Sequence, residues 1–163
     1  MNQAQAYKKL QRLAKQSLAD IKQNIIVKER DHYLAFDRFK ITKNDDGFSV
    51  HRNGEYEHTF INSQNAVSYC VFDKHAHQEH SLQIKHLDKR LQHRMFDLEV
   101  AKNTIAKTQD QDKAVTAAIR AQDYILESKN LKEQINHLVN LAKYFQEKEQ
   151  DNEVNRHRTK DRR

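Results

Sequence analysis

The chain has 163 residues, of which 37% are hydrophobic and 32% are charged, and its formal net charge is +6 at pH 7. This length favours one domain, and the low apolar content favours extended helices that are solvated on one side. No segment approaches the roughly 20 apolar residues of a membrane-spanning helix, so no contact with a membrane is expected. Cys70 is the only cysteine, which excludes a disulfide within the chain.

Turn signals are confined to one region of the sequence. The chain contains no proline, and its two glycines, Gly47 and Gly54, lie close together. Glycine and proline are the strongest turn signals, so long helices should flank one compact β-element. The predicted fold class is α+β and mostly helical. It comprises an N-terminal helix, a three-stranded antiparallel meander, a long antiparallel helical hairpin and a disordered basic tail, with a single domain over residues 1–146.

Residues 3–29 are predicted to form the first helix. Apolar side chains recur there at steps of three and four residues, which places them on one face: Leu10, Ala14, Leu18, Ile21 and Ile25. Four basic side chains lie roughly opposite: Lys8, Arg12, Lys15 and Lys22. This basic stripe suits either contact with phosphates or simple solvation, and its spacing alone favours solvation.

Residues 34–61 are predicted to form the meander. The first turn falls at Asn44–Gly47. The second falls at Asn53-Gly54, the strongest short hairpin signal, because both turn residues need a positive φ. Apolar residues alternate along the three strands: Phe39, Ile41, Phe48, Val50, Tyr56 and Phe60. Asn62 or Ser63 is then expected to cap the next helix.

Residues 63–146 are predicted to form the helical hairpin, with a turn at 107–112 and Asp112 as the cap of its second helix. Heptad-like apolar positions on the two helices define a predicted association face for a partner or a second copy: Leu87, Leu91, Leu98, Leu131, Ile135 and Leu138. Beyond them, residues 147–163 are nearly free of apolar residues and are predicted to be a flexible basic tail.

Positive charge is concentrated at the two ends of the chain. Residues 1–33 hold seven Lys or Arg against three Asp or Glu, and residues 151–163 hold five against three. An acidic partner, nucleic acid among them, is one interpretation, and solubility is the other. The residues that would make such a contact are Lys8, Lys9, Arg12, Lys15, Lys22, Arg156, Arg158, Lys160, Arg162 and Arg163.

No motif points to catalysis. The sequence lacks a nucleophile elbow, a phosphate-binding glycine loop and a dinucleotide fingerprint, so we expect no enzyme, no catalytic residues and no cofactor. Asp73, His77 and His80 follow one another at steps of four and three, a spacing that suits metal ligands on one helix. The order His-Gln-Glu-His differs from the zincin arrangement, and solvated histidines are the favoured interpretation.

A first resemblance covers residues 36–72. The segment from Gly47 to Phe60, with its Asn-Gly hairpin ending in Thr-Phe, is followed by a helix that begins Asn-Ala-Val-Ser-Tyr-Cys. This order resembles the sheet-and-helix plan of plant ethylene-response-type DNA-binding domains and of integrase arm-binding domains, in which the sheet enters the major groove. The sequence departs from those families because its sheet is slightly acidic, so their DNA-contacting residues are not carried over.

A second resemblance covers the whole chain. Residues 48–54 read Phe-Ser-Val-His-Arg-Asn-Gly, residues 59–63 read Thr-Phe-Ile-Asn-Ser, and residues 66–74 read Ala-Val-Ser-Tyr-Cys-Val-Phe-Asp-Lys. Followed by a charged helical hairpin, this order is similar to small proteins of marine tailed phages that have no assigned activity. The resemblance implies a phage protein that is located in the host cytoplasm or in the virion.

Together these observations predict a non-enzymatic binding or assembly module. It would associate with a protein partner or a second copy through the helical hairpin, and contact an acidic partner, such as nucleic acid without sequence preference, through its basic ends. The alternative is a structural virion protein, a capsid or tail component that is ordered by assembly.

Overall fold

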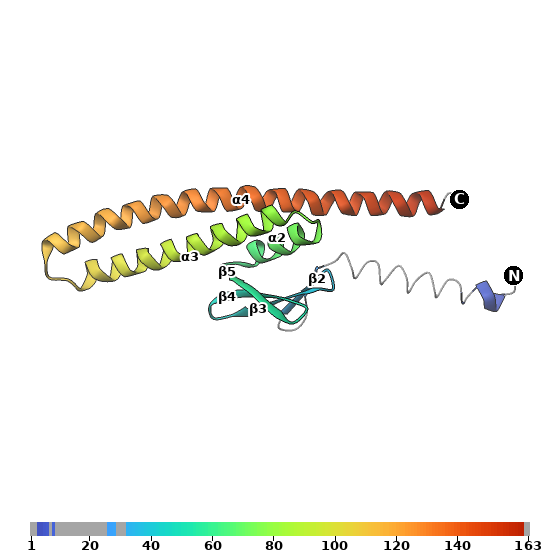
Figure 1. The fold of residues 1–163 in the computed structure, drawn as a ribbon, viewed down its shortest axis with the longest axis horizontal. Coiled ribbons are helices and arrows are strands. Elements are labelled where there is room, and N and C mark those ends of the chain that lie inside the picture. The colour runs from blue at the N-terminus through green and yellow to red at the C-terminus, as the bar shows by residue number, and fades with distance from the viewer. Residues whose placement is uncertain (1–2, 7, 9–25, 29–31, 162–163) are drawn as a thin grey trace. The chain divides into compact units, whose positions relative to one another are not determined.

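The computed structural model describes residues 3–6, 8, 26–28 and 32–161. The chain divides into two compact units, residues 1–59 and 60–163. The first unit holds most of an antiparallel sheet, and the second holds the helices, of which the two longest run antiparallel (Figure 1). The predicted class, mostly helical α+β with a meander and a long helical hairpin, is confirmed. Whether residues 1–146 act as one domain stays a prediction.

The sheet has five strands in the order β1-β2-β3-β4-β5. Their bounds are Ile26–Lys28 for β1, His32–Ala35 for β2, Phe39–Asn44 for β3, Gly47–Arg52 for β4 and Glu55–Phe60 for β5. The first four strands pair antiparallel, each with the next along the chain. The three predicted strands correspond to β3, β4 and β5, so the sequence prediction missed β1 and β2.

The prediction of one helix over residues 3–29 is wrong at its end. Residues 3–6 and 8 are helical, but Ile26–Lys28 is strand β1. Ile26 and Val27 are β-branched and favour a strand, where they lie opposite Ala35 and Leu34 of β2. The remainder of the predicted helix lies outside the described residues.

The turn between β2 and β3 explains why β2 was missed. Phe36 and Asp37 have φ angles of 56° and 58°, so both are left-handed although neither is glycine. The Arg38 amide donates a hydrogen bond of 3.3 Å to the Ala35 carbonyl and closes the turn. A bulky residue rarely adopts a positive φ, so the usual turn composition is absent at this point.

The two predicted hairpin turns are confirmed. Strand β3 ends at Asn44 and β4 begins at Gly47, and the Asn44 side chain accepts a hydrogen bond of 3.0 Å from the Asp46 amide. In the second turn Asn53 and Gly54 have φ angles of 50° and 86°. Both are left-handed, as the type I′ turn requires.

Helices α2 (Ser63–Lys74), α3 (Gln78–Lys107) and α4 (Gln111–Asp161) make up the second unit. Asn62 caps α2, as predicted, because its side chain accepts a hydrogen bond of 2.8 Å from the Asn65 amide. The cap of α4 is Asp110 rather than the predicted Asp112. Its Oδ1 accepts from the Asp112 amide at 3.0 Å, which satisfies a donor of the first turn.

The predicted helix from residue 63 is interrupted between α2 and α3. The His77 amide donates to the Phe72 carbonyl at 2.9 Å and the Ala76 amide donates to the Asp73 carbonyl at 3.1 Å. This is a Schellman motif, in which the left-handed position belongs to Ala76 with a φ of 60°. Glycine usually occupies that position, so its absence left the break without a sequence signal.

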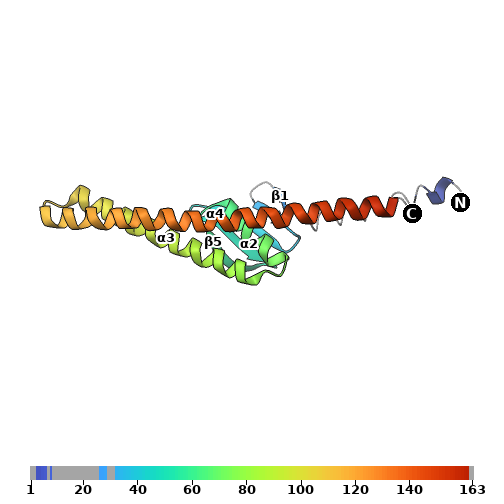
Figure 2. The same cartoon turned by 90° about the horizontal axis from the view of Figure 1, so that it is seen from above.

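Helix α4 is 51 residues long and α3 is 30, so α4 continues past the start of α3 (Figures 1 and 2). The backbone of α4 is helical to Asp161 and therefore includes most of the predicted tail. Flexibility of residues 147–163 is a separate property and stays a prediction.

A buried carboxylate joins the start of α2 to α3. Asp88 is fully buried, and its Oδ1 accepts hydrogen bonds from the Ile61 amide at 3.1 Å and from Asn65 Nδ2 at 2.9 Å. Its Oδ2 accepts from Gln92 Nε2 at 2.6 Å. Because buried polar groups are stable only when they are paired, this network fixes the entry of the chain into the helices.

Candidate protein-interaction surface

The predicted association face lies mostly inside the packed helices. Five of its six residues are only 3–5% exposed, and Leu98 is half-buried; the five are Leu87, Leu91, Leu131, Ile135 and Leu138. These side chains hold the helices of one chain together. Contrary to the prediction, they are not available as an outward surface, and an association surface must be sought elsewhere on the hairpin.

Toward the tip of the hairpin, small side chains are buried and most large apolar side chains are exposed. We call residues 95–126, which comprise the end of α3, the turn and the start of α4, the distal arm. Its buried positions are alanines, Ala101, Ala117 and Ala121, at 7–8% exposure. Leu98 is half-buried, but eight other large apolar residues of the arm are 40–69% exposed: Met95, Phe96, Val100, Ile105, Val115, Ile119, Ile125 and Leu126.

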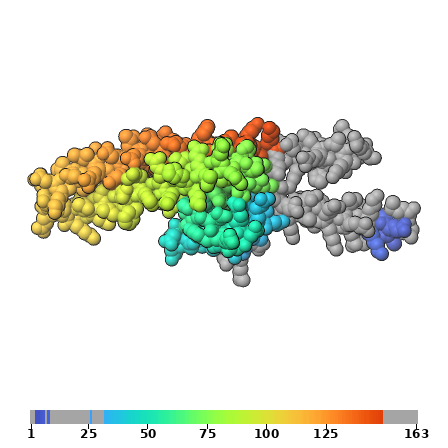
Figure 3. Space-filling view, viewed as in Figure 1, coloured from blue at the N-terminus to red at the C-terminus, as the bar shows by residue number. Residues whose placement is uncertain are grey.

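The contrast with the rest of the hairpin is sharp. In the other described parts of α3 and α4, the exposed large apolar residues are Leu82 and Tyr144. In the space-filling view, the atoms of the distal arm are yellow to orange, and α2 does not cover them on that face (Figure 3). Exposed apolar residues concentrated in one segment in this way make the arm a candidate protein-interaction site.

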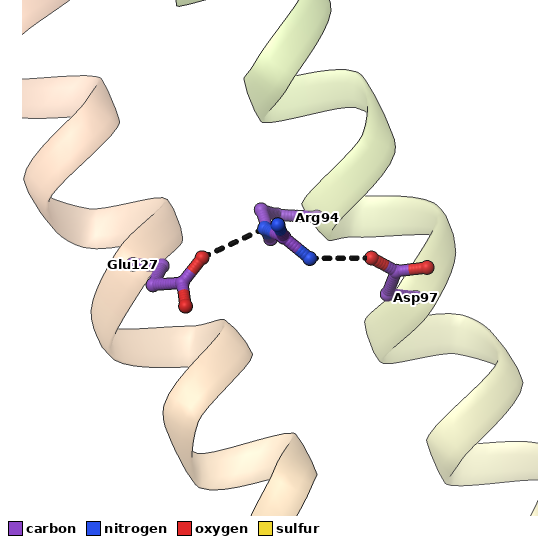
Figure 4. Close-up of polar contacts among 3 residues, drawn as sticks. All are labelled: Arg94, Asp97 and Glu127. Carbon is purple, nitrogen blue, oxygen red and sulfur yellow. Dashed lines mark hydrogen bonds and ion pairs between the residues drawn. The ribbon is translucent and has the colours of Figure 1, made fainter.

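Arg94 marks the base of the distal arm. Its Nη1 lies 2.8 Å from Asp97 Oδ2 on the same helix, and its Nε lies 2.7 Å from Glu127 Oε2 on α4 (Figure 4). Its guanidinium carbon lies 5.6 Å from the centroid of the Tyr124 ring. These groups are partly exposed, so the ion pairs contribute about 1 kcal/mol or less. Their directional contacts fix the register of the two helices where alanine replaces leucine at the buried positions.

Residues of the arm line two grooves. One of about 400 Å³ runs between its helices and is lined by Val100 and Ala101 of α3 and by Ala117 of α4. The other, of about 630 Å³, lies at its base and includes Met95 and Ser128 in its lining. The Ser128 hydroxyl is buried without a hydrogen-bond partner. Both grooves combine apolar and polar lining residues, which suits side chains of a binding partner.

The candidate metal ligands do not form a metal site, although the His77 and His80 ring centroids lie 5.7 Å apart. Asp73 lies in α2, whereas His77 and His80 lie at the start of α3, beyond the Schellman turn. The His77 ring stacks on Phe145, with the ring centroids 4.6 Å apart and an interplanar angle of 5°. Within the described residues, no group of three or more His, Cys, Asp or Glu side chains is placed to hold a metal ion.

The basic ends are only partly described. Lys8 is exposed in a helical segment, and Arg156, Arg158 and Lys160 belong to the helical backbone of α4. The other predicted contact residues lie outside the described part of the chain: Lys9, Arg12, Lys15, Lys22, Arg162 and Arg163. Their contact with an acidic partner therefore stays a prediction.

The sequence did carry a signal for the exposed apolar residues of the arm. Met95-Phe96 and Ile125-Leu126 are adjacent apolar pairs. Neighbouring residues on a helix point about 100° apart, so both members of a pair cannot face one narrow seam. The predicted association face nevertheless consists of large residues only, and the buried alanines of the arm are not among them.

Comparison of the chain with protein-family models, with curated proteins and with solved structures found no match. No helix in the described part of the chain is long and apolar enough to cross a membrane.

Proposed function

We propose that the chain is a non-enzymatic binding and assembly module that engages a protein partner through the distal arm. The observation that carries this proposal is the reversed pattern of the arm, where alanines are buried and eight large apolar residues are exposed. A helix that is apolar on more than one side is normally buried against other elements. None of the described residues covers these side chains in the arm, and we assign that role to another molecule.

The magnitude of the exposed surface supports a specific contact. Burying a large apolar side chain completely contributes about 1.5–3 kcal/mol, and roughly half of that remains to be gained at each position. Eight such positions offer on the order of 6–12 kcal/mol, which is comparable with the estimated 4–15 kcal/mol cost of association. Engagement of most of the arm is therefore needed for stable binding, whereas one or two contacts would not suffice.

The basic ends provide a second contact in this proposal. Their excess of Lys and Arg attracts an acidic partner, and nucleic acid bound without sequence preference is the expected form. This part of the proposal rests on the charge distribution of the sequence, and the arm does not depend on it.

A site-specific photocrosslinking experiment tests the role of the arm. A photoreactive phenylalanine analogue replaces Phe96 in the arm, and the matched control places it at Tyr144, which is aromatic and also more than half exposed. We expect position 96 to crosslink to a defined protein in the native source, and position 144 not to do so. The proposal would be contradicted if the same proteins crosslink at both positions, or if position 96 gives no crosslinked product.

A structural virion protein remains the second candidate. The exposed residues of the arm lie on both α3 and α4, as expected for a subunit that has neighbours on more than one side. Mass spectrometry of purified source particles separates the candidates. A structural component appears there in fixed proportion to the other particle proteins, whereas a free binding module is depleted on purification.

A further inference from the structure

The outer surface of α4 in the distal arm carries a short heptad-like stripe. Val115, Ile119 and Leu126 are 54–59% exposed, and Gln122 completes their spacing of four, three and four residues. At about 100° per residue, the three apolar side chains lie within about 40° of one another. They also lie on the side of α4 opposite Ala117 and Ala121, which are buried.

Opposite charges mark the two ends of this stripe. Asp112 precedes Val115 by three residues and Lys129 follows Leu126 by three, and both are exposed. The same spacing therefore runs from Asp112 to Lys129 without interruption. We call it the outer stripe, and its members are Asp112, Val115, Ile119, Gln122, Leu126 and Lys129.

The outer stripe is complementary to itself when it is reversed. In an antiparallel pair of two such stripes, Asp112 of each copy faces Lys129 of the other, and Val115 faces Leu126. Ile119 then faces Gln122 at the centre. A parallel pair would instead place Asp112 against Asp112 and Lys129 against Lys129, and such like-charge pairs are unfavourable.

We propose that the occupant of this surface is a second copy of the chain, paired antiparallel through the outer stripe. This proposal rests on the proposed function and names the partner for one side of the arm. Ala118 and Ile125 flank the stripe on one side and add apolar contact, while Thr116 and Asp123 flank it on the other. The pairing is isologous, as expected for a twofold dimer.

The size of the stripe sets the strength of the dimer. The 18 residues from Asp112 to Lys129 span about 27 Å of helix at about 1.5 Å per residue, and a helix is about 10 Å wide. This area is well below the ~800 Å² per partner of a standard stable interface. Association is therefore weak and concentration-dependent, and becomes extensive only where copies are crowded or held by another partner.

Sedimentation equilibrium of the full chain, from about 10 µM to about 1 mM, tests the pairing. We expect a monomer–dimer equilibrium that the double substitution I119D and L126D weakens at least tenfold. The matched control L82D and Y144D changes two exposed residues of α3 and α4 outside the distal arm, and should leave the equilibrium unchanged. Circular dichroism verifies that each variant retains its helices. A wild-type monomer throughout, or equal weakening by the control, would overturn the proposal.

Charge exchange tests the antiparallel arrangement. D112K alone places two lysines opposite each other at both ends of the stripe, and K129D alone places two aspartates there, so each should weaken the dimer. The double variant D112K and K129D restores both opposite-charge pairs in an antiparallel dimer but not in a parallel one. Recovery of wild-type affinity supports the pairing, and absence of recovery overturns it.

The two proposals fail separately. A monomeric wild-type chain with specific crosslinks from position 96 would overturn the self-pairing and leave the arm as a surface for a different protein. A dimer that is sensitive to the outer stripe, without any specific crosslink from position 96, would overturn the wider role of the arm and support the self-pairing.

Discussion

Asp88→Ala should destabilise the helical unit strongly, because one buried carboxylate satisfies several donors. Its Oδ1 accepts from the Ile61 amide at 3.1 Å and from Asn65 Nδ2 at 2.9 Å. The substitution removes the acceptor for both donors, and each buried donor that loses its partner costs about 1–3 kcal/mol. Gln92 is only half-buried and can turn toward water, so the loss of its hydrogen bond to Asp88 adds little to the destabilisation.

The free energy of unfolding should therefore fall by about 3–5 kcal/mol in Asp88→Ala, in line with the cost of breaking a buried charged network. Asp88→Asn is the matched control, because its amide keeps one oxygen for the same two donors and removes the buried charge. We expect this variant to lose less than about 1.5 kcal/mol.

Urea unfolding followed by far-ultraviolet circular dichroism measures both variants. If Asp88→Ala unfolds within about 1 kcal/mol of the wild type, the donors do not depend on this carboxylate. If Asp88→Asn is as damaging as Asp88→Ala, the negative charge rather than the acceptor geometry maintains the network. Either result would refute the reasoning.

Two further predictions concern the β-hairpin and the basic ends. Gly54→Val should lower the free energy of unfolding by at least about 1 kcal/mol, since a β-branched residue resists a φ of 86°. An added Cβ meets no atom within 4 Å, so Gly54→Asn, which tolerates this conformation, should cost less in the same urea unfolding assay. Duplex and single-stranded nucleic acids should bind with an affinity that falls steeply with salt, measured by fluorescence anisotropy. Deletion of residues 155–163 with neutralisation of the basic stripe should flatten this dependence by about one unit of slope for each phosphate that the variant no longer neutralises. Neutralising Arg38 and Arg52 on the sheet is the control, and no binding at low salt would contradict this prediction.

Turns and helix caps could be predicted from the sequence where the residue type is one that usually adopts the conformation found there. Asn53-Gly54 and the Asn62 cap were identified because their residue types are those that the turn and the helix start require. The chain also adopts left-handed conformations at Phe36 and Ala76, residues that give no such signal. Strand β2 and the break between α2 and α3 were missed for that reason, whereas β1 was missed because its residues were assigned to the first helix.

The candidate site was harder to predict than the fold. Heptad spacing assigned Leu91 and Leu138 to an association face, whereas both side chains are buried within the hairpin, because spacing alone does not reveal which stripe faces the other helix. In the arm the small side chain of Ala117 is buried, while Ile119 is exposed. The difference follows from how closely the two helices pack, which depends on both of them and not on either sequence alone.

The alanine-lined seam of the distal arm bears on how stability is distributed along the hairpin. Alanine buries far less apolar area than leucine, so the arm gains less from its own packing than the base of the hairpin does. Amide hydrogens in the arm should therefore exchange with solvent sooner than those beside Leu131 and Leu138. Until another molecule covers it, the arm would open more readily than the rest of the hairpin, so that docking also stabilises its helices.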